Sequence, residues 1–250
     1  MKQAAHPAIW RLAADPVPAL ALVSLLALGF AAMRAGGMPG PPSLRWLLPA
    51  GFTVMALMPW LLMNAEGRRQ IGLRRPLQRA AYLPAIALGV VASVACFAAG
   101  AALFGRGSEN WFVSIANNYR GILDTTGMPL WQLHAMFTLP ALMFTPVAEE
   151  LFFRGVLQRT LEQHLPARAS TAIECGAFAV VHLCHHGLVL SVSGLGWMPL
   201  SATLWMILMF LTAWTFAGIR RRSGSLYPVM ASHAAFNLTL NVLIFAALWD

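Results

Sequence analysis

The stretch Thr145–Gln158, TPVAEELFFRGVLQ, places two adjacent glutamates and an arginine inside a run of apolar residues. Similar apolar runs recur along the 250-residue chain, of which 58% is hydrophobic and 10% is charged. Soluble domains usually contain about 25% charged residues, so an ordinary soluble protein is excluded. A charge at membrane depth costs about 2.5–3.5 kcal/mol and usually faces the interior of a helix bundle, where it marks a functional site. The stretch therefore predicts a membrane protein with a functional centre inside it.

Several apolar segments approach or exceed the roughly 20 residues that cross a bilayer as a helix. We therefore predict an all-α fold: a polytopic integral membrane helical bundle of about seven transmembrane helices, with eight as the alternative. The predicted spans are Val17–Met33, Trp46–Met63, Ala80–Phe104, Leu130–Leu157, Ala169–Val189, Met198–Ile219 and Leu226–Leu248. A polar connection separates the third span from the fourth, and a short surface helix is expected in it around Trp111–Leu123.

Lysines and arginines are distributed unevenly between the predicted loops, and this asymmetry predicts the orientation. With the N-terminus inside, twelve of them fall on the cytoplasmic side and four, Arg34, Arg45, Arg106 and Arg120, on the outer side. We therefore predict an N-in, C-out topology. The net charge of +8 is explained by this orientation. We expect no nucleic-acid partner, because no basic face with interleaved aromatic residues stands outside the spans.

Polar groups at membrane depth lie on three of the predicted spans. They are Glu149, Glu150 and Arg154 on the fourth, Glu174, His182, His185 and His186 on the fifth, and His233, Asn237 and Asn241 on the seventh. At a rise of about 1.5 Å per residue, Glu149, His182 and His233 lie ~12, ~20 and ~10 Å from the cytoplasmic span ends. They are therefore expected to meet in the cytoplasmic half or near the midplane. A polar cluster that only locks helices together is the alternative to a functional site.

Helical spacing separates the two glutamates. Glu150 and Arg154 lie at i and i+4, the spacing at which opposite charges pair on one helix face. Glu149 is rotated by about 100° from Glu150, so it is expected to face a cavity instead. Pro146 removes one backbone hydrogen bond and is expected to loosen the helix there. The stretch is thus interpreted as one working carboxylate beside a structural ion pair.

Two further pairs share helix faces: Phe178 with His182, and His233 with Asn237. A buried carboxylate near a histidine suits the activation of a water molecule. A second histidine and an asparagine amide suit the stabilisation of a developing oxyanion. This combination predicts hydrolysis of an amide bond inside the membrane.

The motifs EELFFR (Glu149–Arg154), FAVVH (Phe178–His182) and HAAFN (His233–Asn237) stand in this order on separate spans. They resemble the EExxxR, FxxxH and HxxxN motifs of the CPBP (Abi) intramembrane proteases, which include the CAAX prenyl proteases of the Ras-converting type. The resemblance extends from Leu130 to Leu248. It implies one membrane domain with a membrane-embedded cavity. Residues 1–129 supply N-terminal transmembrane helices and a connecting loop, and residues 130–250 form the catalytic core.

The resemblance also implies roles for the motif residues. Glu149 and His182 would activate the water, and His233 and Asn237 would stabilise the oxyanion. The supporting residues would be Glu150, Arg154 and Phe178.

The family was earlier classified as metalloproteases, but the resemblance implies a glutamate-dependent mechanism without a metal ion. We therefore expect no cofactor, and the chain lacks the HExxH zinc helix. A bound zinc ion stays open as an alternative, with Glu149, His182 and His233 as ligands. His186 is a further candidate, because HLCHH (His182–His186) places two histidines at i and i+4.

The first functional hypothesis is an intramembrane endopeptidase that cleaves a membrane-anchored or lipidated protein or peptide near its C-terminus. The second is a non-catalytic membrane partner or immunity protein of the same fold. The third is a proton- or metal-coupled transporter that uses the same buried groups. The Ala- and Arg-rich, Lys-poor composition favours a location in a bacterial inner membrane.

Overall fold

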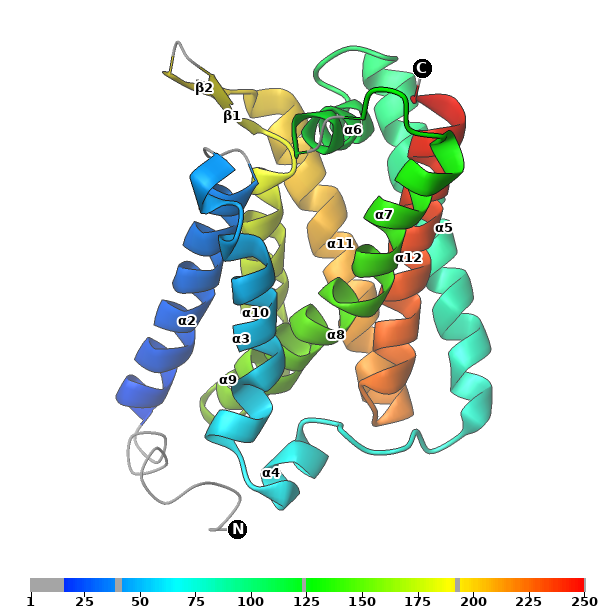
Figure 1. Ribbon diagram of the computed structural model, residues 1–250. Coiled ribbons are helices and arrows are strands. Elements are labelled where there is room, and N and C mark those ends of the chain that lie inside the picture. The colour runs from blue at the N-terminus through cyan, green and yellow to red at the C-terminus, as the bar shows by residue number, and fades with distance from the viewer. Residues whose placement is uncertain (1–15, 39–41, 123–124, 192–193, 250) are drawn as a thin grey trace.

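The computed structural model describes residues 16–38, 42–122, 125–191 and 194–249 and shows a helix bundle with one short β-hairpin at one end (Figure 1). The first half contains α2 (Pro16–Gly37), η1 (Pro42–Leu44), α3 (Leu47–Leu62), α4 (Ala65–Gln70), η2 (Arg79–Ala81), α5 (Tyr82–Phe104) and α6 (Trp111–Ile122). The second half contains α7 (Leu130–Met143), α8 (Thr145–Glu149), η3 (Glu150–Leu157), α9 (Gln158–His164), α10 (Ala167–Val181), η4 (His182–Cys184), β1 (Leu188–Ser191), β2 (Gly194–Trp197), α11 (Pro199–Ser223) and α12 (Tyr227–Ala247). The predicted all-α membrane fold is confirmed.

Six helical segments of the described residues are long and apolar enough to cross a membrane. Large apolar side chains point outward from them: Leu28 is 67% exposed, Leu83 is 76% exposed and Val91 is 62% exposed. Water would not tolerate such a surface as a contiguous patch, whereas lipid tails match it. The outward apolar surface therefore agrees with an integral membrane location.

The helix predicted over Ala169–Val189 is shorter than expected. α10 ends at Val181 after 15 residues, the turn η4 follows, and the chain enters an antiparallel hairpin in which Leu188 pairs with Trp197. Gly187 has a φ of +108°, which an L side chain rarely adopts, so the helix cannot continue through it. The apolar run beyond Gly187 belongs to the hairpin, because a short apolar run fits a strand as well as a helix.

The start of α2 and the end of α12 lie at opposite ends of the bundle, as the N-in, C-out topology requires (Figure 1). α4 and the Arg-rich end of α11 lie at the end where α2 starts. Which end faces the cytoplasm stays a prediction. One assignment in the count of loop lysines and arginines is wrong. Arg34 was assigned to an outer loop, but its side chain is 7% exposed and lies inside the bundle.

The fourth predicted span is a 35-residue helical run, Leu130–His164, that changes direction and form along its length. α7 ends at Met143, α8 restarts at Thr145 with Pro146 in its first turn, and η3 is a π-helix. Pro146 has no N–H to donate, which agrees with the predicted loosening. π-helical turns are often found at functional sites, and this one begins directly after Glu149.

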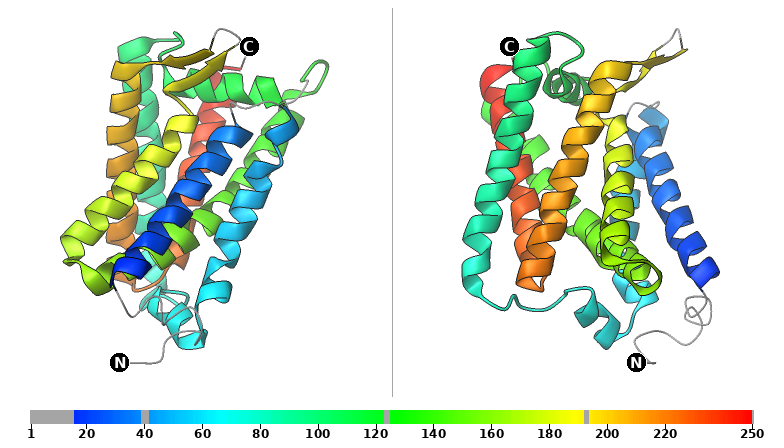
Figure 2. Two further views of the ribbon diagram at one scale, coloured as in Figure 1. Left: turned by 90° about the vertical axis from the view of Figure 1, so that its left-hand side faces the viewer. Right: turned by 180° about the vertical axis from the view of Figure 1, so that it is seen from behind.

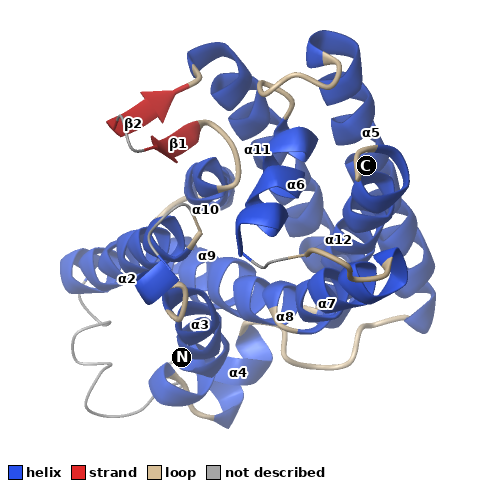
Figure 3. Ribbon diagram, turned by 45° about the horizontal axis from the view of Figure 1, so that its top comes forward, coloured by secondary structure: helices blue, strands red, loops and turns tan. Residues whose placement is uncertain are grey.

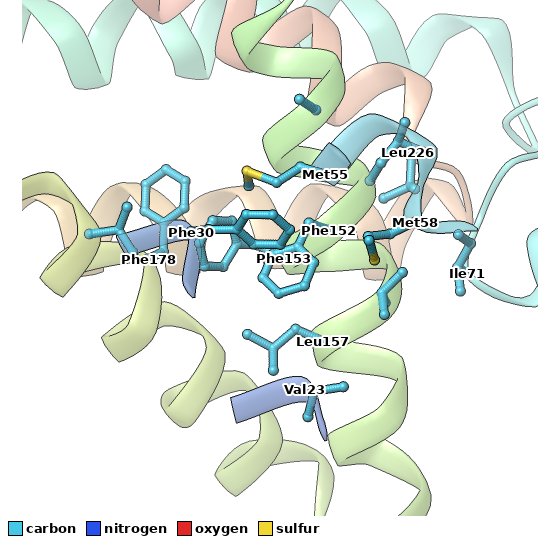
Figure 4. Close-up of a cluster of buried hydrophobic side chains, with 14 of the residues drawn as sticks. Val23, Phe30, Met55, Met58, Ile71, Phe152, Phe153, Leu157, Phe178 and Leu226 are labelled. Carbon is cyan, nitrogen blue, oxygen red and sulfur yellow. The ribbon is translucent and has the colours of Figure 1, made fainter. Parts of the chain in front are cut away.

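All eight residues of η3 are buried, and its apolar side chains, among them Phe152, Phe153 and Leu157, belong to one core cluster (Figure 4). The ring of Phe152 meets Phe30 of α2 edge-on at 4.7 Å, and Phe153 meets Phe178 of α10 at 5.3 Å. Each aromatic pair of this kind contributes about 0.5–1.5 kcal/mol beyond its buried area. The cluster therefore connects η3 to α2 and α10.

α5 lies directly beside α12, as the two views of Figure 2 show. A Cβ atom at Gly89 would lie 2.0 Å from the carbonyl oxygen of Ser232, so only glycine permits this contact. Small residues allow helix backbones to approach closely where lipid offers no hydrophobic driving force. This contact positions the turn of α12 that carries His233.

Candidate active site

Glu149 occupies the last position of α8 and is completely buried. Its Oε1 atom is paired with the guanidinium group of Arg34. Its Oε2 atom has no hydrogen-bond partner and lies 3.9 Å from Nε2 of His182 and 3.9 Å from Nε2 of His233. Helix α8, the turn η4 that follows α10, and helix α12 thus bring the three predicted residues together. The two oxygens of one carboxylate have different surroundings.

The orientation of both imidazoles is set by a hydrogen bond on the opposite nitrogen. Nδ1 of His182 lies 2.7 Å from the carbonyl oxygen of Phe178, to which it donates. Nδ1 of His233 lies 2.8 Å from Oε1 of Glu150 and donates to that carboxylate. Each ring therefore directs Nε2 toward Oε2 of Glu149. The contact between Glu150 and His233 was not predicted from the sequence.

Behind Glu149, a buried ion-pair network confirms the predicted pairing of Glu150 with Arg154. Their closest atoms, Oε1 and Nη1, are 3.1 Å apart, and both side chains are completely buried. Nε of Arg154 also lies 3.4 Å from Oε1 of Glu174, which adds a second carboxylate. We call Glu150, Arg154 and Glu174 the ion-pair network. Buried charges persist only when they are paired in this way.

Phe178 packs against both Arg154 of the ion-pair network and His182. The guanidinium carbon of Arg154 lies 4.1 Å from the centre of its ring, within cation–π range. The imidazole of His182 lies 4.2 Å from the ring centre, which confirms the predicted packing. Phe178 therefore contacts both parts of the site.

A cavity of about 440 Å³ lies next to these groups, but Glu149, which was expected to face a cavity, does not line it. Polar parts of its wall come from Arg34, His182, His233 and Asn237, and most of the remaining wall is apolar. Its wall includes α6, which lies across the bundle between α10, α11 and α12 (Figure 3). α6 is at the end of the bundle where α12 finishes. The cavity thus extends from the histidines toward the end of the bundle opposite the predicted cytoplasmic end.

Two asparagines of α12 lie on the cavity wall. His233 and Asn237 both line the cavity, as predicted for residues on one helix face. The amide Nδ2 of Asn237 donates to the carbonyl oxygen of Ala141 at 2.9 Å. Oδ1 of Asn241 accepts a hydrogen bond from the phenol of Tyr119 at 2.8 Å. Burial raises the pKa of Tyr119 above its usual range, so this phenol stays protonated and remains a donor.

The two additional histidines of HLCHH do not join His182 at Glu149. Nε2 of His185 accepts from Nη2 of Arg34 at 2.7 Å. Nδ1 of His186 lies 2.7 Å from the hydroxyl of Ser114, and its Nε2 lies 2.9 Å from that of Ser201. Because the α-helix ends at Val181, the i, i+4 spacing no longer places His186 beside His182. His186 is 2% exposed and is therefore buried between Ser114 and Ser201.

No group of three or more His, Cys, Asp or Glu side chains among the residues that the structure describes has the arrangement of a metal site. Of the three residues named as alternative zinc ligands, His182 and His233 each have Nε2 3.9 Å from Oε2 of Glu149. The metal-free mechanism remains a prediction.

Arg34 is the residue of this site that the sequence did not indicate. It was assigned to an outer loop because it follows an apolar run near the end of a predicted span. One signal was present, since an arginine in the last turn of an apolar helix must find a partner unless it reaches water. Its partner, Glu149, is 115 residues away in the sequence.

Comparison with known proteins finds one family for the second half of the chain. The model of the Rce1-like family, described as type II CAAX prenyl endopeptidase Rce1-like, matches residues 130–239. No curated protein and no solved structure matches the chain. The matched segment contains Glu149, His182, His233 and Asn237, whereas Arg34 lies outside it.

Proposed function

We propose, on the premise that residues 130–239 belong to the Rce1-like family of type II CAAX prenyl endopeptidases, that this protein is an intramembrane endopeptidase acting near the C-terminus of a membrane-anchored or lipidated substrate. One observation carries the proposal. Oε2 of Glu149, buried and without a hydrogen-bond partner, lies 3.9 Å from the Nε2 atoms of both His182 and His233. A single water molecule fits hydrogen bonds to such a set of atoms.

Glu149 acts as the general base in this mechanism. The carboxylate accepts a proton from the water through Oε2, with His182 Nε2 as a second acceptor that orients the water. The water oxygen then attacks the carbonyl carbon of the scissile peptide bond. The proton held by Glu149 passes to the leaving nitrogen as the carbon–nitrogen bond breaks. The products are a carboxylic acid and a free amine.

His233 and Asn237 stabilise the oxyanion that forms during the attack. The carboxylate of Glu150 binds Nδ1 of His233 and so orients the ring with Nε2 directed toward the place where the oxyanion forms. The amide of Asn237 has two N–H groups, and one of them already donates to Ala141. The second N–H is left for the substrate oxygen. Loss of one such donor typically lowers the rate by about 10²–10³-fold.

The mechanism is proposed as metal-free, because Glu149 and His182 suffice to activate water. The purified protein should keep its cleavage rate after prolonged treatment with a strong chelator and removal of the chelate. A rate that falls and returns only with added zinc would assign Glu149, His182 and His233 as metal ligands instead.

The composition of the cavity wall favours a substrate with an apolar group. Side chains such as Phe137, Trp205 and Leu240 form most of its surface. An apolar pocket with a few convergent polar groups is the usual form of a ligand site. The occupant is accordingly a lipidated or apolar C-terminal segment, presented within a membrane that we propose to be a bacterial inner membrane.

The direct test uses an internally quenched peptide that ends in a farnesylated Cys-aliphatic-aliphatic-X sequence, offered to the purified protein in lipid nanodiscs. We expect a released C-terminal fragment, identified by mass spectrometry. The same peptide without the farnesyl group shows whether the lipid is required.

If neither peptide is cleaved, membrane proteomes with and without the protein should be compared for newly formed termini. Absence of both cleavage and new termini would favour a non-catalytic membrane partner of the same fold.

A further inference from the structure

Arg34 is a charged residue of the candidate site that comes from outside the matched segment. It lies in the last turn of α2, and its side chain is 7% exposed. It forms part of the cavity wall beside His182 and His185. Removing a guanidinium group from water costs several kcal/mol, so its contacts inside the protein must offset this cost.

The guanidinium group is held by three different elements. Nη1 pairs with Oε1 of Glu149, and Nη2 donates to Nε2 of His185 at 2.7 Å. The guanidinium carbon lies 5.4 Å from the ring centre of Phe52 in α3. Contacts from α8, α3 and the turn after α10 thus leave this group little freedom to move.

The backbone of α2 is fixed at the same level. A Cβ atom at Gly37 would lie 2.7 Å from Cγ of Leu48, so the end of α2 approaches α3 more closely than another residue would permit. This contact lies three residues from Arg34, less than one helical turn away. The position of the guanidinium group is therefore set by helix packing as well as by its own contacts.

These contacts determine which oxygen of Glu149 faces the histidines. A carboxylate can rotate about its last bond and exchange its two oxygens. Arg34 removes that freedom, because Oε1 is engaged by Nη1 while Oε2 is left 3.9 Å from both imidazoles. Restricting a reacting group to its productive geometry is a recognised source of rate enhancement.

We propose that Arg34 is a positioning residue for Glu149, so that the hydrolytic site is completed by helix α2 and not by the matched segment alone. This proposal rests on the proposed function for its catalytic meaning. The contact itself does not depend on which reaction is catalysed. Two experiments test the contact between Arg34 and Glu149 and its effect on catalysis separately.

The first experiment measures the contact through thermal stability. Melting temperatures are compared for the parent, Arg34→Gln, Glu149→Gln and the double variant. If the two side chains form an ion pair, the double variant loses less stability than the two single losses added together. Additive losses would overturn the proposed contact, whatever the protein does.

The second experiment measures the cleavage rate of the farnesylated peptide. Arg34→Ala should lower kcat about 10²-fold with little change in KM, because the carboxylate is misplaced while the apolar side chains of the cavity wall are unchanged. Added guanidinium ion should restore part of kcat, since it can occupy the place of the deleted side chain. Arg34→Lys should recover only part of the rate, because an ammonium group lacks the planar fork that holds both Glu149 and His185.

Arg45→Ala is the matched control. Arg45 also comes from the first half of the chain, where it donates to the carbonyl oxygens of Ile122 and Gly121 at 2.8 and 2.7 Å. Its loss should leave kcat unchanged. If Arg34→Ala keeps the parent kcat, or loses activity without any response to guanidinium, Arg34 has only a structural role and the proposal is overturned. If Glu149→Gln cleaves as fast as the parent, the proposed function itself fails.

Discussion

Glu149 and Glu150 are neighbours in the chain, yet they belong to two different regions of the molecule. Glu149 faces the histidines with one oxygen that has no hydrogen-bond partner. Glu150 lies in the ion-pair network, where it contacts Arg154 and the distal nitrogen of His233. The rotation of about 100° per helical residue separates them. The difference agrees with the proposal that the Glu149 region reacts with the substrate and that the ion-pair network holds this region in place.

The largest expected effect comes from Glu149→Gln. The amide cannot accept a proton from water, so the cleavage rate should fall by about 10²–10⁴-fold. Its Oε1 atom can still accept from Arg34, so the helix content measured by circular dichroism should be retained. Glu162→Gln is the control, because Glu162 belongs to a pair with Arg220 in α11 instead of the site. Equal cleavage rates for Glu149→Gln and Glu162→Gln would contradict a special role of the Glu149 region in cleavage.

Arg154→Met should act mainly on stability. It leaves the carboxylates of Glu150 and Glu174 buried without their cation, which typically costs about 3–5 kcal/mol. Thermal unfolding followed by tryptophan fluorescence should show a large drop in melting temperature, and activity should fall with it. Arg159→Met is the control, since its pair with Glu162 spans 3.8 Å at a side chain 29% exposed. An unchanged melting temperature for Arg154→Met would show that the ion-pair network is not structural.

Phe178→Leu tests the boundary between the regions. The substitution removes the ring that faces Arg154 on one side and His182 on the other. We expect a loss of about 2 kcal/mol in the free energy of unfolding, together with a smaller loss of activity than Glu149→Gln causes. Phe97→Leu removes an edge-on contact with Phe112 away from both regions and should leave the cleavage rate unchanged. A Phe178→Leu variant that is stable but inactive would show that this ring contributes to catalysis and not to stability.

The smallest effect is expected from Tyr119→Phe in the cavity wall. It deletes the phenol that donates to Asn241 and should lower the free energy of unfolding by about 1 kcal/mol. The cleavage rate should stay near that of the parent, because no hydrogen bond or ring contact joins Tyr119 to Glu149, His182 or His233. A rate loss as large as that of Glu149→Gln would extend the reacting region to α6.

The sequence predicted the helices of the bundle well, because apolar length is a local property. It also predicted the pairing of Glu150 with Arg154 and the packing of Phe178 on His182, since both pairs share one helix face. It was wrong about the segment after Val181, where a hairpin replaces the end of a helix. A short apolar run has no period that distinguishes the two structures.

The sequence by itself determined which residue types stand at membrane depth and which of them share a helix face. Only the tertiary structure decided that Arg34 pairs with Glu149, that His233 contacts Glu150, and that His186 is held by Ser114 and Ser201. The physical reason is the sequence separation of the residues that interact. Helix length and face depend on residues within a few positions, whereas these contacts join positions 15 to 115 residues apart and exist only after the helices have packed.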